Sequence, residues 1–142
     1  MADVHSKEIR SYNMSRIRGK DTKPEIMVRK FLYAQGFRYR LHVKDLPGKP
    51  DIVLPKFKTV IFVHGCFWHS HYGCKKATLP KTRTEWWKAK ISKNVEKDAA
   101  SITRLIEAGW NVLIIWECEL KSITSSDVLK DLSERIIRNK QL

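Results

Sequence analysis

Residues 64–74, HGCFWHSHYGC, combine side chains that bind metal ions with large aromatic side chains. Cysteine thiolates and histidine imidazoles are the usual ligands of tetrahedral zinc. Cys66, His69, His71 and Cys74 have the residue types and close spacing of a zinc knuckle. The alternative, small buried cysteines beside surface histidines, is disfavoured because four such ligands fall within nine residues. We therefore expect a bound zinc ion.

A third cysteine lies far along the chain but can complete this site. Cys118 follows the apolar run 110–117, and it can reach the loop if that run is a strand next to residues 59–65. Three thiolates and one imidazole make a closed tetrahedral set, which suits a structural role better than a catalytic one. Such a set leaves one histidine over for proton transfer. The residues alone do not choose between His69 and His71 as the ligand.

A second group of polar residues is suited to phosphodiester chemistry. Asp51 begins an apolar strand after the turn LPGKP (46–50), and a carboxylate at a strand end is a typical Mg²⁺ ligand. If two strands form a hairpin here, Asp51 falls near Val63 or His64. Glu25 can approach from the preceding helix. Each has a plainer interpretation, namely a turn carboxylate, a sheet-edge histidine and a helix-capping acid, but their convergence beside the zinc loop favours a catalytic site.

The pattern resembles nucleases of the PD-(D/E)xK type, in which acidic residues and a lysine surround Mg²⁺. Pro50 and Asp51 match that pattern, whereas His64 stands where a lysine is expected. The change suggests a histidine as the general base that activates water.

The aromatic residues of the loop are candidates for contact with DNA. Phe67 and Trp68 would be held outward by a zinc-braced loop, although burial in the core is the alternative. Apolar side chains that insert between base steps unstack and kink DNA. Met14 is a candidate wedge from a second direction. Trp86 and Trp87 are adjacent on one helix, so both cannot face its core, and one is available for DNA.

The charge distribution predicts a polyanionic partner. The formal net charge is +13, and residues 7–40 and 75–97 carry ten and eight basic side chains against three and two acidic ones. Residues 117–142 carry five of each sign, which suggests one basic face rather than a uniformly basic surface. An anionic membrane surface is disfavoured because no basic segment has a continuous apolar face. With no signal segment or membrane-length apolar run and an odd cysteine count, we expect a cytoplasmic protein.

Apolar periodicity and turn residues predict eight elements in one domain of 142 residues. We expect a DNA-binding basic arm at 1–20 and capping boxes at Thr22–Glu25 and Thr82–Glu85. The expected helices are 11–19, 22–35, 82–108 and 126–138, and the expected strands are 37–43, 51–55, 59–65 and 110–117. The strand at 110–117 is apolar throughout, so helices should cover both faces of a mixed sheet. The predicted fold class is an α/β three-layer sandwich.

Several stretches together resemble the very-short-patch repair (Vsr) mismatch endonucleases. The resemblance covers most of residues 1–120, and HGCFWH with the downstream Cys118 is its most specific part. The matching stretches are MADVH (1–5), NM (13–14), DT (21–22), LPGKPD (46–51), VIF-HGCFWH (60–69), TRTE-W (82–87), KNVE-D (93–98) and GW-VLI-WEC (109–118). The family implies a restriction-endonuclease-like fold with a structural zinc loop.

The resemblance also implies a role for each site residue. Asp51 would bind Mg²⁺ through its carboxylate and Val63 through its main-chain carbonyl, with His64 as general base, His69 aiding the leaving group and Glu25 orienting the site. Zinc would be held by Cys66, His71, Cys74 and Cys118. DNA would be contacted by intercalating Phe67, Trp68 and Trp87, by the Met14 wedge, and by Lys90 and Asn94 at the bases. Val63 replaces an expected threonine, and His71 and Cys74 are one residue further apart than the family pattern.

The expected activity is Mg²⁺-dependent nicking 5′ to the thymine of a T·G mismatch left by deamination of 5-methylcytosine. The expected partner is double-stranded DNA with that mismatch, bound by a monomer near the bacterial nucleoid, and downstream repair proteins would follow. One alternative is a non-catalytic zinc module that binds mismatched or bent DNA. Another is a nuclease that acts on RNA.

Overall fold

The computed structural model describes residues 22–41, 43–121 and 124–141. The basic arm expected at 1–20, with its helix at 11–19 and Met14, lies outside the described residues. Among the described helices, none combines the length and the apolar character needed to cross a bilayer.

The described part of the chain forms helices, strands and two short 3₁₀ turns. They are the helices α2 (Lys23–Ala34), α3 (Thr84–Glu107), α4 (Glu117–Lys121) and α5 (Ser125–Gln141), the strands β1 (Arg40–Leu41), β2 (Ile52–Leu54), β3 (Thr59–His64) and β4 (Asn111–Trp116), and two short 3₁₀ turns, η1 (Pro55–Phe57) and η2 (Lys75–Ala77). The hairpin, the long helix, the last strand and the C-terminal helix therefore confirm the predicted order over this part of the chain.

The four strands form one mixed sheet in the order β1-β2-β3-β4. β2 pairs antiparallel with β3 as the predicted hairpin, with Ile52 opposite Ile61. β3 and β4 are parallel neighbours over their full lengths, and His64 stands opposite Trp116. Helix α3 makes the crossover between them, as a parallel pair requires.

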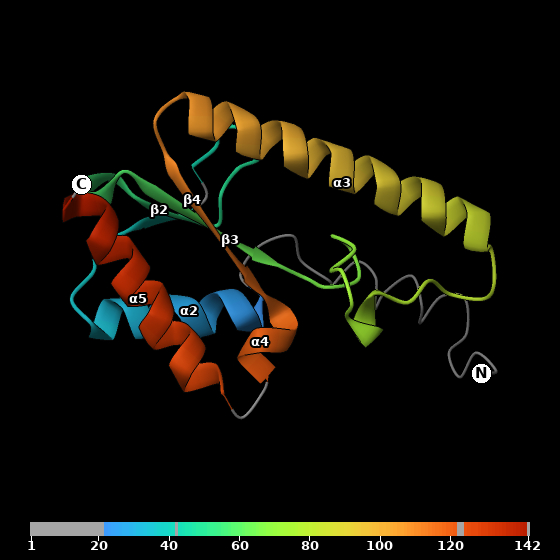
Figure 1. Ribbon diagram of the computed structural model, residues 1–142, viewed down its shortest axis with the longest axis horizontal. Coiled ribbons are helices and arrows are strands. Elements are labelled where there is room, and N and C mark those ends of the chain that lie inside the picture. The colour runs from blue at the N-terminus through green and yellow to red at the C-terminus, as the bar shows by residue number, and fades with distance from the viewer. Residues whose placement is uncertain (1–21, 42, 122–123, 142) are drawn as a thin grey trace.

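Helices cover both faces of the sheet (Figure 1). On β3, Ile61 belongs to a buried cluster that includes Val28 of α2 and Leu132 of α5. Its neighbours Val60 and Phe62 belong to a second cluster, with Leu105 of α3. Because successive strand residues point to opposite faces, an unbroken apolar strand fills two cores. This arrangement confirms the mixed sheet between helices that the apolar run predicts.

The start of α2 confirms the first predicted capping box. The hydroxyl of Thr22 accepts a hydrogen bond of 3.4 Å from the main-chain N–H of Glu25, and a proline occupies the first turn. Gly36, with φ of 93°, follows the end of the helix. The cap fixes Glu25 at the edge of the sheet, where its side chain is buried.

The second predicted capping box is wrong. Helix α3 begins at Thr84, after Arg83 with φ of 56°, and no side chain caps it. The Thr84 hydroxyl instead donates to the carbonyl of Pro80 at 2.8 Å. Thr82 therefore precedes the helix by two residues.

Finer details of the elements also differ from those expected. The strand expected at 37–43 is only Arg40–Leu41, and the short α4 was not predicted. Three apolar helix residues, Met27, Val95 and Ile106, are 40%, 40% and 58% exposed rather than buried. Leu105 makes the contact with the sheet, and Ile106 is turned by about a quarter of a helical turn. The N-terminal part of α3 extends beyond the sheet (Figure 1).

Candidate active site and metal centre

The three cysteines and one histidine of the loop region meet in one cluster. The donor atoms of Cys66, His71, Cys74 and Cys118 all lie within 4.8 Å of one another. The sheet causes this meeting, since His64 and Trp116 are paired in parallel strands and a cysteine lies two residues beyond each of them. Cys66 follows β3, and Cys118 lies in the first turn of α4.

The loop between Cys66 and Cys74 is folded tightly around the cluster. The N–H of His71 donates to the carbonyl of Cys66 at 3.0 Å, and the N–H of Cys74 donates to the carbonyl of His71 at 3.2 Å. The His71 ring stacks on Trp116 with centroids 4.1 Å apart. Its Nδ1 lies 3.4 Å from Sγ of Cys118. The imidazole is thus oriented by aromatic packing toward the thiols.

The chemistry of this donor set fits a soft divalent cation. Burial, and secondarily the two neighbouring thiols, raises the pKa of Cys66 to about 12. Without a cation, Cys66 is therefore a neutral thiol at physiological pH. A bound cation would favour the thiolates, and four sulfur and nitrogen donors suit tetrahedral zinc.

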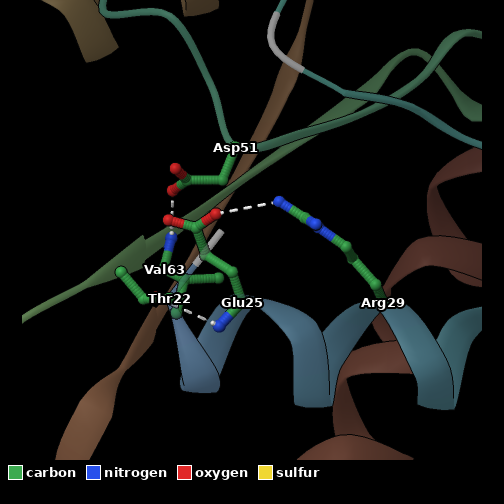
Figure 2. A network of polar contacts seen from close by, with 5 residues as sticks. All are labelled: Thr22, Glu25, Arg29, Asp51 and Val63. Atoms are coloured by element: carbon green, nitrogen blue, oxygen red, sulfur yellow. Dashed lines mark hydrogen bonds and ion pairs between the residues drawn. The ribbon is translucent and has the colours of Figure 1, made fainter. Parts of the chain in front are cut away.

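Asp51 lies against the end of β3, beside Glu25 of α2 (Figure 2). Its Oδ2 accepts a hydrogen bond of 2.7 Å from the main-chain N–H of Val63. Oε2 of Glu25 accepts a hydrogen bond of 3.0 Å from Arg29, one turn further along the helix. Two carboxylates and one guanidinium thus share a small, largely buried space.

Burial makes this pair of carboxylates hard to ionise together. It is the largest cause that raises the pKa of Asp51, from 3.8 to about 7, and the charge of Glu25 adds to it. The hydrogen bond from Val63 and the charge of Arg29 act in the opposite direction. Two crowded carboxylates that hold a proton at neutral pH form a favourable place for a hard divalent cation, which would neutralise both.

The other two catalytic candidates lie face to face. The rings of His64 and His69 stack with centroids 3.8 Å apart and planes 4° from parallel. Nδ1 of His69 lies 2.5 Å from Oδ2 of Asp98, which is on α3. The donor atoms of the three residues lie within 4.8 Å of one another, which is also close enough for a shared cation. Parallel rings do not direct both lone pairs at one point, and Asp98 already occupies Nδ1 of His69, so the arrangement favours proton transfer.

His64 is neutral at physiological pH. Burial, followed by the charge of His69, lowers its pKa from 6.5 to about 4. Its Nδ1 is buried and has no hydrogen-bond partner among the described residues. A neutral imidazole has one unprotonated ring nitrogen, which can accept a proton as a general base must.

One cavity of about 660 Å³ connects these groups. The pair of carboxylates and the pair of histidines both line it, and so do residues of the aromatic loop and of α4. The lining residues that bear on the chemistry are Glu25, Lys49, Asp51, Val63, His64, Trp68, His69, Asp98 and Glu117. A phosphate in this cavity can therefore be within reach of the acids and the histidines at the same time.

The aromatic side chains of the loop pack on the N-terminal part of α3. The rings of Phe67, Trp68 and Trp87 lie 5.3 to 5.7 Å apart in edge-to-face arrangements. The carbonyl of Trp68 accepts a 3.2 Å hydrogen bond from Nδ2 of Asn94. Phe67, Trp68 and Trp87 are all partly exposed. The alternative of full core burial is wrong, and the rings form a cluster at the surface.

Some site residues were not predicted from the sequence. Asp98 lies within the stretch KNVE-D, but nothing in its spacing from His69 indicates that the two touch. Arg29 could have been found, because it lies four residues after Glu25 on a helix. Glu117 lines the cavity only because α4 turns it there.

Lys90 is exposed on α3, as a residue that contacts bases must be.

Comparison with known proteins gives a consistent answer. The family model described as "DNA mismatch endonuclease Vsr" matches residues 2–76. The DNA mismatch endonuclease Vsr of Escherichia coli (strain K12) is 50% identical over 121 residues, which cover 85% of this chain and 77% of the relative. The type II nicking enzyme V.NmeAIP of Neisseria meningitidis serogroup A is 47% identical over 138 residues, 97% of this chain and 96% of the relative. V.XorIIP of Xanthomonas oryzae pv. oryzae, also a type II nicking enzyme, is 48% identical over 123 residues, 87% and 90% of the two chains.

Proposed function

Because the chain belongs to the Vsr family of DNA mismatch endonucleases, we propose that it nicks one DNA strand 5′ to the thymine of a T·G mismatch. The chain is a DNA endonuclease, a hydrolase that acts on phosphodiester bonds in DNA repair. What we propose beyond this activity is the T·G mismatch as substrate, the strand that is cut and the ions that take part. The observation that carries it is the convergence of Asp51, His64, His69 and Asp98 on one cavity.

Asp51 and the main-chain carbonyl of Val63 would hold Mg²⁺. Bound there, Mg²⁺ supplies Lewis-acid stabilisation of the charge that develops on the phosphate. Arg29 bonds to Glu25, as Figure 2 shows, and both side chains act on the neighbouring Asp51 through their charges. A carboxylate fixed by the N–H of Val63 presents its oxygens in a defined direction, which an octahedral ion requires.

The two histidines divide the proton transfers. His64 takes the proton from the attacking water, since its ring is neutral and lines the cavity. His69 gives a proton to the 3′ oxygen that leaves, and Asp98 orients its ring through Nδ1. Parallel stacking of the rings keeps the two functions on adjoining positions of one cavity.

We propose that the thiol cluster holds one structural zinc ion. Its ligands are Cys66, His71, Cys74 and Cys118, which leaves His69 for catalysis. The ion would join the ends of β3 and β4 through the loop that carries Phe67 and Trp68. This link stiffens the loop, so the aromatic rings can push against stacked bases.

Mismatch recognition rests on the aromatic cluster. Phe67, Trp68 and Trp87 insert beside the mismatch, and Met14 acts from the opposite groove. The rings are already gathered at the surface, which lowers the ordering cost of insertion. A mispaired step opens at a lower cost than a paired one, which contributes to selectivity.

Lys90 and Asn94 of α3 read the bases. The amide of Asn94 donates to the main-chain carbonyl of Trp68, which ties α3 to the loop that carries the inserting ring. The remaining proposals follow from the family and the charge. The chain acts as a single domain, with residues 1–20 as a DNA-binding arm. It works as a monomer at the bacterial nucleoid, in the cytoplasm, ahead of other repair proteins.

The test is a nicking assay on labelled duplexes. With Mg²⁺, a T·G duplex should yield a single nick 5′ to the thymine on the T strand only, and matched T·A duplex should remain intact. All other mismatches and several flanking sequences serve as comparison substrates. Equal nicking of matched and mismatched DNA would contradict the mismatch proposal, and nicking in EDTA would contradict the magnesium proposal.

The same assay separates the alternatives. A non-catalytic module has no need of Asp51, His64, His69 and Asp98 in one cavity, and it would bind the T·G duplex without cutting it. Replacement of the T strand by RNA tests the RNA nuclease, which would cut the hybrid faster than the DNA duplex.

A further inference from the structure

A second groove opens beside the catalytic cavity. It has a volume of about 490 Å³, and three basic side chains, Lys49, Lys97 and Arg104, contribute to its lining. Gly48, Lys49 and Asp98 line both spaces, so the groove is continuous with the catalytic cavity. None of the roles proposed above uses this groove.

The groove is formed where the turn before β2 packs tightly on α3. A Cβ atom at Gly48 would lie 2.7 Å from Cβ of Ser101, so only glycine allows this approach. Gly48 and Lys49 have φ values of 73° and 48°, two consecutive residues in the left-handed region. A non-glycine residue in that region is uncommon, and it persists where the surrounding structure holds it. The turn therefore places Lys49 at a fixed position beside α3.

The two basic residues of α3 that line the groove share one face of the helix. Lys97, Ser101 and Arg104 follow the spacing i, i+4, i+7, which places them in one row along α3. No ion pair with a described acidic residue is found for Lys49, Lys97 or Arg104 within 4.0 Å. The acidic residue in the lining is Asp98, which is already paired with His69. Three cations around one groove, with no acidic partner in the described part of the chain, favour an anion.

We propose that this groove binds the backbone phosphate next to the scissile phosphate on the strand that is cut. The inference rests on the proposed function, because it assumes that the scissile phosphate lies in the cavity of Asp51 and His64. From there the strand would pass over Gly48 and Lys49 into the groove, where Lys97 and Arg104 neutralise the next charge. Phosphate contacts fix the register of a protein on DNA. A register fixed one nucleotide from the reacting bond restricts cleavage to a single linkage.

Charge removal on α3 tests the groove. The double variant Lys97→Ala/Arg104→Ala should bind DNA about a hundredfold more weakly, and the slope of log K against log salt should fall by about one for each cation removed. The loss should be equal for T·G and T·A duplexes, because phosphates carry no sequence information. The control is Lys130→Ala/Arg135→Ala on α5, which packs on the other face of the sheet and leaves both side chains exposed. Lys97→Arg/Arg104→Lys should restore binding.

Replacement of single phosphates by uncharged methylphosphonates identifies the phosphate that the groove binds. A methylphosphonate moved along each strand of the duplex should weaken wild-type binding when it lies next to the nick site on the T strand. At that position the double variant should lose no further affinity, because both changes remove the same contact. Additive losses there, or a shared effect only on the complementary strand, would overturn the proposal.

Different results would contradict the proposed nicking activity and the proposed phosphate site in the groove. If the wild type does not nick a T·G duplex, the proposed function fails. If the wild type nicks normally and the double variant binds with the affinity and salt slope of the α5 control, only the groove proposal fails. Thermal unfolding of each variant, with a midpoint equal to that of the wild type, confirms that the fold is intact.

Discussion

The main-chain N–H of Val63 donates a 2.7 Å hydrogen bond to Oδ2 of Asp51, across the hairpin of β2 and β3. The bond directs a partly buried carboxylate along the end of β3, toward the cavity that His64 also lines. It is a structural contact, and in the proposed mechanism it also fixes the direction in which the second carboxylate oxygen faces. Substitution of this carboxylate should change both the nicking rate and the stability of the protein.

Replacement of Asp51 by Asn should abolish nicking but not DNA binding. The amide keeps the size of the side chain and loses the charge that holds Mg²⁺, so we expect at least a roughly thousandfold lower single-turnover nicking rate. Binding to a T·G duplex, measured by fluorescence anisotropy, should change by less than about threefold. Asp45→Asn, at an exposed position of the same turn region, is the matched control. Nicking by Asp51→Asn at the wild-type rate would remove Asp51 from the catalytic site.

The same substitution should stabilise the metal-free protein above neutral pH. Burial raises the pKa of Asp51 from 3.8 to about 7, so the folded protein holds a proton that the unfolded chain has released between these values. The contribution of Asp51 to stability is full below pH 4 and is lost as the pH rises to about 7. Asn carries no charge, so at pH 8 Asp51→Asn should raise the free energy of unfolding by about 2 kcal/mol, which is less than the full shift because Asp51 keeps some solvent contact.

Urea unfolding in EDTA at pH 5 and pH 8 measures this effect. The difference between wild type and variant should be larger at pH 8. Equal differences at the two pH values would show that ionisation of Asp51 does not destabilise the folded protein. Addition of Mg²⁺ at pH 8 should stabilise the wild type and not the variant.

Substitution of Cys118 should release zinc and loosen the loop. Cys118→Ser removes one of four donors whose atoms lie within 4.8 Å of one another, and a closed zinc site tolerates such a loss poorly. We expect one equivalent of zinc in the purified wild type by mass spectrometry and much less in the variant. The melting temperature should fall by roughly 10 °C, and chelation of the wild type should lower it by a similar amount. A wild-type protein that contains no zinc when purified from zinc-supplemented medium would contradict the assignment.

Asp98 should act through His69. Its carboxylate lies 2.5 Å from Nδ1 of that ring, so Asp98→Asn should disturb the orientation of the group proposed to assist the leaving oxygen. We expect nicking slower by roughly ten- to a hundredfold, with duplex binding retained. A substrate with a 3′-phosphorothiolate at the nick site has a better leaving group and needs less proton donation. The penalty of Asp98→Asn should shrink on this substrate, and an undiminished penalty would indicate a merely structural role. Glu96→Gln, exposed on the same helix, is the control.

Trp68 should determine mismatch preference more than the nicking step. Trp68→Ala removes the partly exposed ring that meets Phe67 and Trp87, and base stacking on an aromatic ring contributes about 1 to 3 kcal/mol. The ratio of T·G to T·A affinity should therefore fall by about ten- to a hundredfold. Competition binding measures this ratio, with Tyr33→Ala as a control at an aromatic position that is 58% exposed on α2. Unchanged discrimination would remove Trp68 as the wedge.

The local parts of the fold could be predicted from the sequence. The Thr22–Glu25 cap, the β2–β3 hairpin and the long α3 all depend on contacts between residues close in the chain. The unbroken apolar run of β4 required cover on both faces, and two core clusters provide it. The second cap failed because the backbone at Arg83 adopts a left-handed conformation that the TxxE pattern does not reveal.

For the site, the sequence by itself determined the kinds of ligand and most of their spacing. Cys66, His71 and Cys74 are local, since nine residues cannot separate their side chains far. Only the tertiary structure decided that Cys118 joins them, because that depends on the parallel pairing of β3 with β4 across a helix of 24 residues. The contact of Asp98 with His69 and the groove between the 46–50 turn and α3 have the same origin. Burial of two apolar sheet faces fixes where α3 lies, and that position is a property of the whole chain rather than of any short pattern.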